Sequence, residues 1–381
     1  MKKEEKEFLD YLQLSKQSEE EYLGTEFEEE DDDIIEDEIP YNVQDIRVEQ
    51  KMITVYQIEH WIESDMLNLK PEYQRNLVWN DSRKSALIES LMLKIPIPAF
   101  YLDEDTDGVK NVIDGMQRLS TIHDFLNDEF VLKKMQYLTK CEKKKFSELD
   151  IKFRSRIEET MLAVNILDER CPQMVKFDVF RRVNTGGVPL NPQEIRNIMA
   201  KSEVRILLKE MANSNEFAEA TNLKVKDTRM GAQELCLRYL SILLNYDWEN
   251  KELKNYFGLL KTMDSTILEL NRMTDEQRDK ILQDFKLVLN QCKVILKELS
   301  FCKLDNNKIN KSLFTSWVVA LNILKIDNGS IEEKAELIRN RYVEVLRNGS
   351  EFYDAITSST GTKKHVCIAL ETIRNILEEC I

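Results

Sequence analysis

The segment Val112–Ser120 reads Val-Ile-Asp-Gly-Met-Gln-Arg-Leu-Ser. Its first residues are typical of an apolar strand, and Leu119–Leu126 has the spacing of an amphipathic helix. Gly115 stands where the strand changes to the helix. Glycine there permits backbone angles that other residues avoid, and it leaves room for a ligand to approach the main chain. The segment therefore predicts a strand-to-helix turn that can bind an anion.

Three polar side chains of this turn suit such a site. Asp114 can hold a metal ion or orient a water molecule, Gln117 can hydrogen-bond an oxygen, and Arg118 can bind it through two N–H groups. The first amides of the helix would face the same anion. The alternative is a purely structural turn, in which Asp114 caps the helix and Arg118 pairs with a nearby acid.

The net charge of −15 is concentrated at the N-terminus. Residues 1–40 contain 17 acidic residues and four lysines, so the rest of the chain is nearly neutral, at −2. Glu26–Glu38 has only three apolar residues and cannot bury enough surface to offset its ordering entropy. We expect residues 1–45 to be a disordered acidic tail, either a solvated leader or a mimic of nucleic acid that occupies a basic groove.

Several function classes are disfavoured by composition. The three histidines, at positions 60, 123 and 365, are too few for an HNH nuclease or a Cys/His zinc site. No apolar run approaches the roughly 20 residues that span a bilayer, and the N-terminus lacks a secretory signal. We therefore expect a cytoplasmic protein without a membrane partner.

The pattern of the chain changes near residue 200, because all seven prolines precede it. Before that point, short apolar runs alternate with turns, which predicts an α+β domain over residues 46–200. After it, segments with a period of 3.6 residues predict a helical domain over residues 201–381. The expected strands cover 52–55, 100–103, 111–114 and 161–167. The expected helices cover 56–66, 83–93, 140–159, 172–182, 203–213, 230–245, 250–271, 275–299, 311–325, 331–347 and 364–380, with a further one that begins at Pro192 and is capped by Asn191.

Two further segments carry candidate binding residues. Tyr73, Gln74 and Arg75 precede Trp79 in a short loop and can clamp a phosphate and stack on a base, although Trp79 alone is better explained as a core anchor. Asn184-Thr185-Gly186 follows Arg182 and is typical of an anion-binding turn. A helix C-cap and a tight turn explain the glycines of this second segment equally well.

These three motifs occur in a characteristic order. Tyr73-Gln74-Arg75 is followed by Asp114-Gly115-Met116-Gln117-Arg118 and then by Phe180–Gly187, with Gln193-Glu194 behind it. In this order and spacing, residues 45–200 closely resemble the N-terminal domain of GmrSD-type modification-dependent restriction enzymes. The resemblance departs at Met116, where the Asp-Gly-Gln-Gln-Arg signature of that family has a glutamine. Many relatives carry a second domain with a His-Asn-His nuclease site, and we expect none within these 381 residues, because their three histidines are too few for one.

The resemblance implies a fold similar to ParB and sulfiredoxin, and work on nucleoside triphosphates in defence against foreign DNA. It implies an NTP-binding, NTP-hydrolysing sensor or regulatory component that uses Mg²⁺ at Asp114. Asp114, Gln117 and Arg118 would then be catalytic. The nucleotide-binding residues would be Tyr73, Gln74, Arg75, Gly115, Arg182, Asn184, Thr185 and Gly186.

A second hypothesis is a DNA-binding or scaffold module without catalysis. The lysines at 143–145 and the basic stretch Lys152–Arg156 can follow a DNA backbone, although acidic neighbours dilute them. A third, direct nicking of DNA from a metal at Asp114, is weaker without a nuclease domain. The sequence leaves open which nucleotide is bound, and whether DNA, a separate nuclease subunit or further copies of the chain join it.

Overall fold

The computed structural model describes residues 24–26, 46–69, 79–105, 107–183 and 191–381. They fall into two compact units, Tyr41–Leu190 and Asn191–Ile381, the second together with Met1–Pro40. The boundary between the units falls after Leu190, whereas the sequence predicts it at residue 200. Helix α7 (Pro192–Met199) belongs to the second unit because it packs against other helices of that unit. In the described part of the chain, every helix is too short or too polar to span a membrane.

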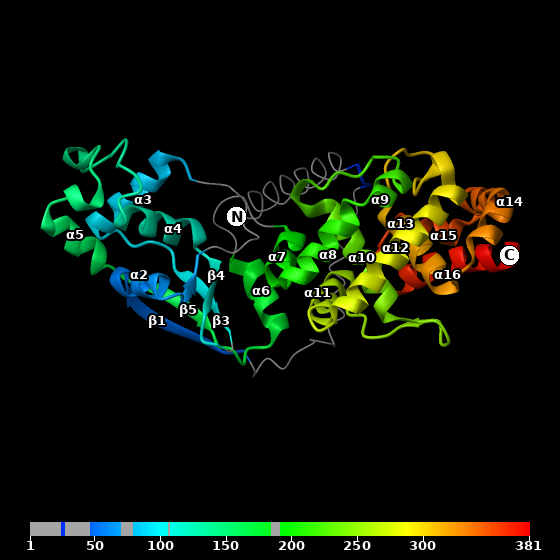
Figure 1. Ribbon diagram of the computed structural model, residues 1–381, viewed down its shortest axis with the longest axis horizontal. Helices are drawn as coiled ribbons and strands as arrows, with labels where there is room; N and C mark the ends of the chain where they lie inside the picture. Colours follow the sequence, from blue (N-terminus) through cyan, green and yellow to red (C-terminus); the bar gives the residue numbers. More distant parts are fainter. Residues whose placement is uncertain (1–23, 27–45, 70–78, 106, 184–190) are drawn as a thin grey trace, which may run out of the picture. The chain divides into compact units, whose positions relative to one another are not determined.

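The first unit contains a mixed five-stranded sheet. Its strand order is β1-β5-β3-β4-β2, so β1 lies at one edge (Figure 1). Strand β5 runs antiparallel to β1 and parallel to β3, whereas β4 runs antiparallel to β3 and parallel to β2. The strands are β1 (Val48–Thr54), β2 (Leu67–Asn68), β3 (Phe100–Glu104), β4 (Lys110–Asp114) and β5 (Met161–Leu167).

One face of this sheet forms the core of the unit. The alternating residues Leu162, Val164 and Ile166 of β5 are buried there, as the apolar run in the sequence predicts. Their neighbours come from four helices that contribute residues to the same core cluster. The helices of the unit are α2 (Val55–Glu63), α3 (Asp81–Leu93), α4 (Met116–Leu126), α5 (Ile151–Glu158) and α6 (Gln173–Val183). The α+β prediction is confirmed.

The charged stretch 140–159 differs from the single helix expected there. It divides into two short 3₁₀ turns, Thr139–Cys141 and Phe146–Glu148, and then α5. Lys143 adopts a left-handed backbone conformation, with φ of 66°. Its amide and the Lys144 carbonyl bond to the Leu132 backbone, at 2.7 and 3.1 Å. These bonds to a distant loop replace the local bonds that a helix would need.

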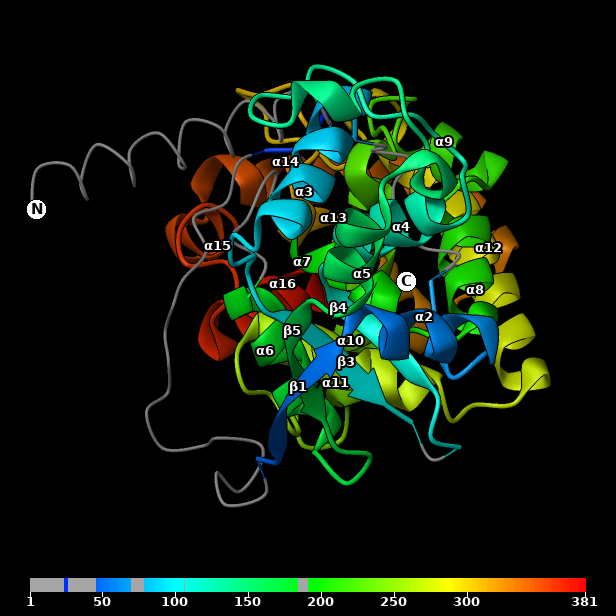
Figure 2. The ribbon, with the colours of Figure 1, turned by 90° about the vertical axis from the view of Figure 1, so that its left-hand side faces the viewer.

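The second unit is helical, as expected (Figure 2). The prediction of a helix over 250–271 is wrong in its first part, where two short strands, β6 and β7, form a hairpin. The helix begins only after Gly258, whose φ of 83° is not helical. The remaining elements are α7, α8 (Ser202–Ala212), α9 (Asn215–Ala220), α10 (Gly231–Asn245), β6 (Tyr246–Asp247), β7 (Glu252–Leu253), α11 (Leu259–Leu270), α12 (Asp275–Leu296), α13 (Lys311–Leu324), α14 (Asn328–Asn348), α15 (Ser350–Ala355) and α16 (Lys363–Cys380).

Residues 24–26 pack against this helical unit, which differs from the disorder expected for Glu26. The Glu26 amide donates to the Ile309 carbonyl at 2.9 Å. Its carboxylate accepts from the amide groups of Asn306 and Asn310, at 2.9 and 2.8 Å, and lies 3.2 Å from Lys303. Partners distant in the sequence therefore stabilise a residue whose local composition predicts disorder. The rest of the expected tail, up to residue 45, lies outside the described residues.

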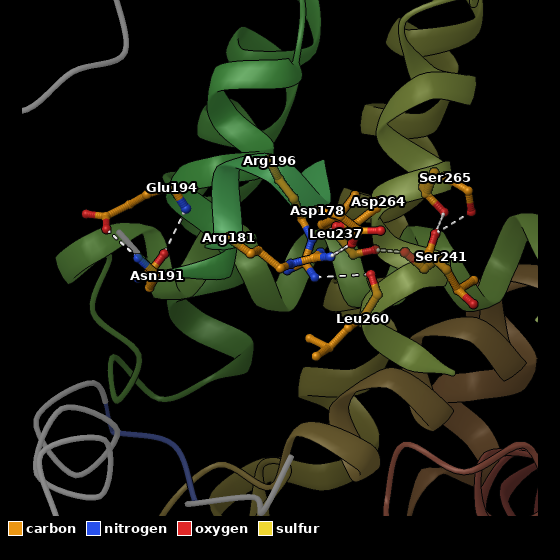
Figure 3. A network of polar contacts seen from close by, with 12 residues as sticks. Asp178, Arg181, Asn191, Glu194, Arg196, Leu237, Ser241, Leu260, Asp264 and Ser265 are labelled. Carbon is orange, nitrogen blue, oxygen red and sulfur yellow. Dashed lines mark hydrogen bonds and ion pairs between the residues drawn. The ribbon is translucent and has the colours of Figure 1, made fainter. Parts of the chain in front are cut away.

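A buried ion pair joins two helices of the helical unit. Arg196 of α7 and Asp264 of α11 are both fully buried, with Nε and Oδ1 2.8 Å apart, and Arg196 also donates to the Leu260 carbonyl at 3.2 Å (Figure 3). Helix α7 itself begins with the expected cap, because Asn191 and Glu194 form a capping box. The cap sets where α7 starts, and the ion pair ties α7 to α11.

We predict that Asp264→Asn destabilises the protein by roughly 3–5 kcal/mol, because it leaves the buried Arg196 cation without its counter-charge. Equilibrium denaturation with urea measures the change. The matched control is Glu219→Gln, which removes an exposed partner of Lys293 and is expected to cost less than about 1 kcal/mol. Equal losses in the two variants would contradict the prediction.

Candidate functional site

The turn between β4 and α4 has the predicted geometry. Asp114 ends the strand, Met116 starts the helix, and Gly115 between them has φ of 101°. A β-carbon at Gly115 would lie 2.3 Å from the Phe100 ring. Glycine is therefore required both by the backbone conformation and by the close approach of β3. Met116 is 7% exposed and belongs to the core cluster, so an apolar residue suits this position of the motif.

Arg118 is held by several groups of the same unit. Its Nη2 donates to the Asp114 carboxylate at 2.7 Å and to the Ala99 carbonyl at 3.1 Å, and its Nη1 donates to the Pro98 carbonyl. The guanidinium lies over the Phe100 ring, 4.4 Å from the centroid. The two carbonyls and the ring come from residues 98–100, at the start of β3, so Arg118 joins the turn to the neighbouring strand.

The Asp114–Arg118 pair is only partly accessible, with side-chain exposures of 28% and 11%. Burial raises the pKa of Asp114 above its usual range, although Arg118 and the Gly115 amide act in the opposite direction. Burial likewise lowers the pKa of Arg118, against the effect of Asp114. Both shifts favour the neutral form of the group, and perturbed pKa values of this kind occur at functional sites as well as in structural ion pairs.

Gln117 connects this turn with the end of the first predicted loop. Its Oε1 accepts a hydrogen bond from the Trp79 amide at 3.3 Å. The Trp79 ring packs against the core, as the sequence favours for this residue, and the Arg83 guanidinium lies 4.8 Å from its centroid. Two motifs that are 38 residues apart in the sequence are thus in contact.

The other predicted residues are only partly placed. Tyr73, Gln74 and Arg75 lie outside the described residues, and so do Asn184, Thr185 and Gly186. Arg182 is exposed near the end of α6, a helix that packs against β4. The assignments of these residues to nucleotide binding stay predictions.

The structure also shows polar contacts that sequence reasoning missed. The Glu59 carboxylate of α2 lies 2.9 Å from His123 Nδ1 and accepts from Asn127 at 2.9 Å, so a carboxylate orients the histidine of α4. Glu89 of α3 is 4% exposed and accepts from the amides of residues 136–138. No spacing in the sequence indicates these partners, because each is more than 40 residues away.

A metal ion would find one carboxylate at the turn, that of Asp114. In the described part of the chain, no group of three or more acidic, histidine or cysteine side chains could hold a metal ion. Mg²⁺ that accompanies a nucleotide takes most ligands from phosphates and water and needs only one or two carboxylates. The residues present therefore fit an ion that arrives with a triphosphate, and not one that the protein holds alone.

We predict that Gly115→Ala destabilises the protein by roughly 2–4 kcal/mol, because left-handed strain adds to the overlap with Phe100. Gly108→Ala is the matched control: its φ is 79°, but a β-carbon there meets nothing within 4 Å, so the expected cost is about 1 kcal/mol. Thermal and urea unfolding compare the two. If Gly115→Ala cost no more than Gly108→Ala, the close approach of Phe100 would not restrict this position.

Comparison with known proteins gives one family. Residues 58–200 match the family model described as "GmrSD restriction endonuclease, N-terminal domain". The match begins within α2, ends after α7 and includes all three predicted motifs. Searches of curated proteins and of solved structures returned no match.

Proposed function

Because residues 58–200 belong to the family of GmrSD N-terminal domains, we propose that the chain is a nucleoside-triphosphate-binding component of a restriction-like defence system. The domain itself is one that a restriction endonuclease carries, which links the chain to such systems. The turn at Gly115 is the proposed site for the triphosphate. The observation that carries the proposal is the open N-terminus of α4.

Helix α4 starts without a side-chain cap. Gly115 occupies the N-cap position, and no side chain there accepts a hydrogen bond from the helix. The amides of the first turn, Met116 to Arg118, have no carbonyl partner within the helix, and the helix dipole adds positive potential at the same end. A phosphate group supplies the acceptor oxygens that this end of the helix lacks.

The side chains around this end suit complementary roles. Gln117 lies in the first turn and accepts a hydrogen bond from the backbone amide of Trp79, which is four residues after Arg75 in the sequence. Arg118 is committed to Asp114 and to two carbonyls, which favours a positioning role. The charge for the phosphates would then come from Arg75 and Arg182. A direct phosphate contact of Arg118 requires that it exchange its Asp114 contact for one to the ligand.

Asp114 is the residue that we propose for the chemistry, if the nucleotide is hydrolysed. Its carboxylate is held in place by Arg118, remains 28% exposed, and stands at the end of β4 beside the open helix terminus. It can orient a water molecule toward the terminal phosphate or contact the Mg²⁺ that the triphosphate brings. That ion would supply neutralisation of the phosphate charge.

We predict that Gln117→Glu weakens triphosphate binding by at least about tenfold, because it brings a negative charge next to the phosphates. The fold should be retained, since the new carboxylate can still accept from the Trp79 amide and an acid is favourable in the first turn of a helix. Calorimetric titration of the full chain with ATP, GTP, CTP and UTP in the presence of Mg²⁺ measures the affinity.

The control is Gln57→Glu, the same change in the first turn of α2, where the residue is exposed. It should bind as the wild type does. Equal affinity in Gln117→Glu and wild type would place the nucleotide elsewhere. If the wild type bound none of the four triphosphates but bound DNA, the scaffold hypothesis would replace this one.

We predict, as a separate step, that Asp114→Asn abolishes phosphate release while it retains most of the affinity. The amide keeps the shape of the side chain but cannot act as a base or as an anionic ligand of Mg²⁺. Phosphate release by wild type and variant, each at saturating nucleotide, is the measurement. Binding without release in the wild type would make the chain a sensor rather than an enzyme.

A further inference from the structure

Strand β1 is an edge strand that carries the charged residues Glu49 and Lys51 but is neither short nor interrupted. It is seven residues long, contains neither proline nor glycine, and pairs with β5 in an unbroken register (Figure 1). Natural edge strands are commonly shortened, bulged or covered. Among the described residues, β5 is the strand that pairs with β1. In that part of the chain, the edge of β1 that faces away from β5 has no partner strand.

The free edge exposes backbone groups of alternate residues. The Val55 amide donates to the Thr160 carbonyl, and the Asp168 amide donates to the Arg47 carbonyl, so the odd-numbered residues of β1 point their polar groups toward β5. The N–H and C=O groups of Val48, Gln50 and Met52 must then point away from β5. These three residues form the edge that a partner strand can use.

Apolar side chains accompany this edge. Val48 and Met52 are 45% and 57% exposed, and Met161 on β5, which shares their face of the sheet, is 49% exposed. Glu49 and Lys51 lie on the opposite face, with exposures of 65% and 44%, and are 2.9 Å apart. The exposed apolar side chains and the charged pair of β1 therefore lie on opposite faces of the strand.

The sequence of the edge is complementary to itself. Gln50 is flanked by two residues of opposite charge, Glu49 and Lys51. The next residue on each side is apolar, Val48 before Glu49 and Met52 after Lys51. A second, antiparallel β1 centred on Gln50 would place Glu49 opposite the other Lys51, and Val48 opposite the other Met52. Opposite charges and apolar pairs across strands stabilise a sheet.

The same register satisfies the backbone. It pairs the outward-pointing groups of Val48, Gln50 and Met52 with those of the second strand. A slip of one residue would align outward with inward groups and lose these bonds. A slip of two residues in either direction would place Glu49 opposite Glu49, or Lys51 opposite Lys51. Among registers within two residues of it, backbone and charge therefore favour the register centred on Gln50.

We propose that β1 is a homodimer interface, in which two copies of the chain pair their β1 strands antiparallel about Gln50. The contact is isologous, since each copy offers the same residues. It joins the two five-stranded sheets into one continuous sheet and covers the exposed Val48 and Met52 side chains. This assignment does not depend on the proposed nucleotide site.

Charge reversal tests the register with the full chain. Glu49→Lys and Lys51→Glu each place like charges opposite one another and should be monomeric. A mixture of the two variants should form a heterodimer, because one strand then carries two positive charges and the other two negative charges. Sedimentation velocity should give twice the 44.9 kDa of the chain for the wild type and for the mixture, and the monomer mass for each variant alone.

Gln50→Pro is the second variant. The N–H of Gln50 in the wild type points away from β5. Proline therefore removes a donor of the interface without loss of a hydrogen bond within the sheet. The variant should be monomeric, with an unchanged far-ultraviolet circular dichroism spectrum. A monomeric wild type, a dimer that survives Gln50→Pro, or a mixture of the charge variants that stays monomeric would each overturn the proposal.

Discussion

The contact between Arg118 and the segment before β3 determines the geometry of the first unit around the proposed site. One guanidinium binds the Asp114 carboxylate and the carbonyls of Pro98 and Ala99, and lies over the Phe100 ring. It therefore fixes the end of β4, the start of α4 and the entry to β3 relative to one another. Gly115 is the residue that permits this closeness, because any side chain there would overlap with Phe100. The open helix terminus is a consequence of the same constraint, since a glycine at the N-cap has no side chain to bind the first amides.

Local signals predicted much of the fold. Strand β5 has the predicted bounds, because its apolar run is short and bounded by polar residues. Helix α7 begins at Pro192 with Asn191 as its cap, since capping involves residues only three positions apart. The prediction was wrong where distant residues decide the conformation, as at Lys143, whose backbone bonds to Leu132, and at Glu26, which binds side chains of Asn306 and Asn310.

In the candidate site too, the sequence predicted the local features and not the contacts with distant residues. The sequence indicated Asp114, Gln117 and Arg118 by their types and their place after a strand, and the structure places all three at one turn. It could not indicate that Arg118 would be occupied by two carbonyls and a ring, or that Gln117 would bind the Trp79 amide. Those partners come from other elements, and no periodicity within a single segment encodes them. Residue types thus predicted which groups are present, whereas tertiary contacts determine which of them are available to a ligand.

Sheet order relates the proposed interface to the proposed site. Strand β1 is at one edge, and β5 and β3 stand between it and β4, which ends at Asp114. Because neighbouring strands are about 4.8 Å apart, β1 and β4 are separated by roughly 14 Å across the sheet. Antiparallel pairing through β1 adds strands on the far side of β1 and leaves the end of β4 uncovered. Each copy in such a dimer would keep its own turn open, so that nucleotide binding and pairing can be varied independently by substitutions at Gln117 and at Gln50.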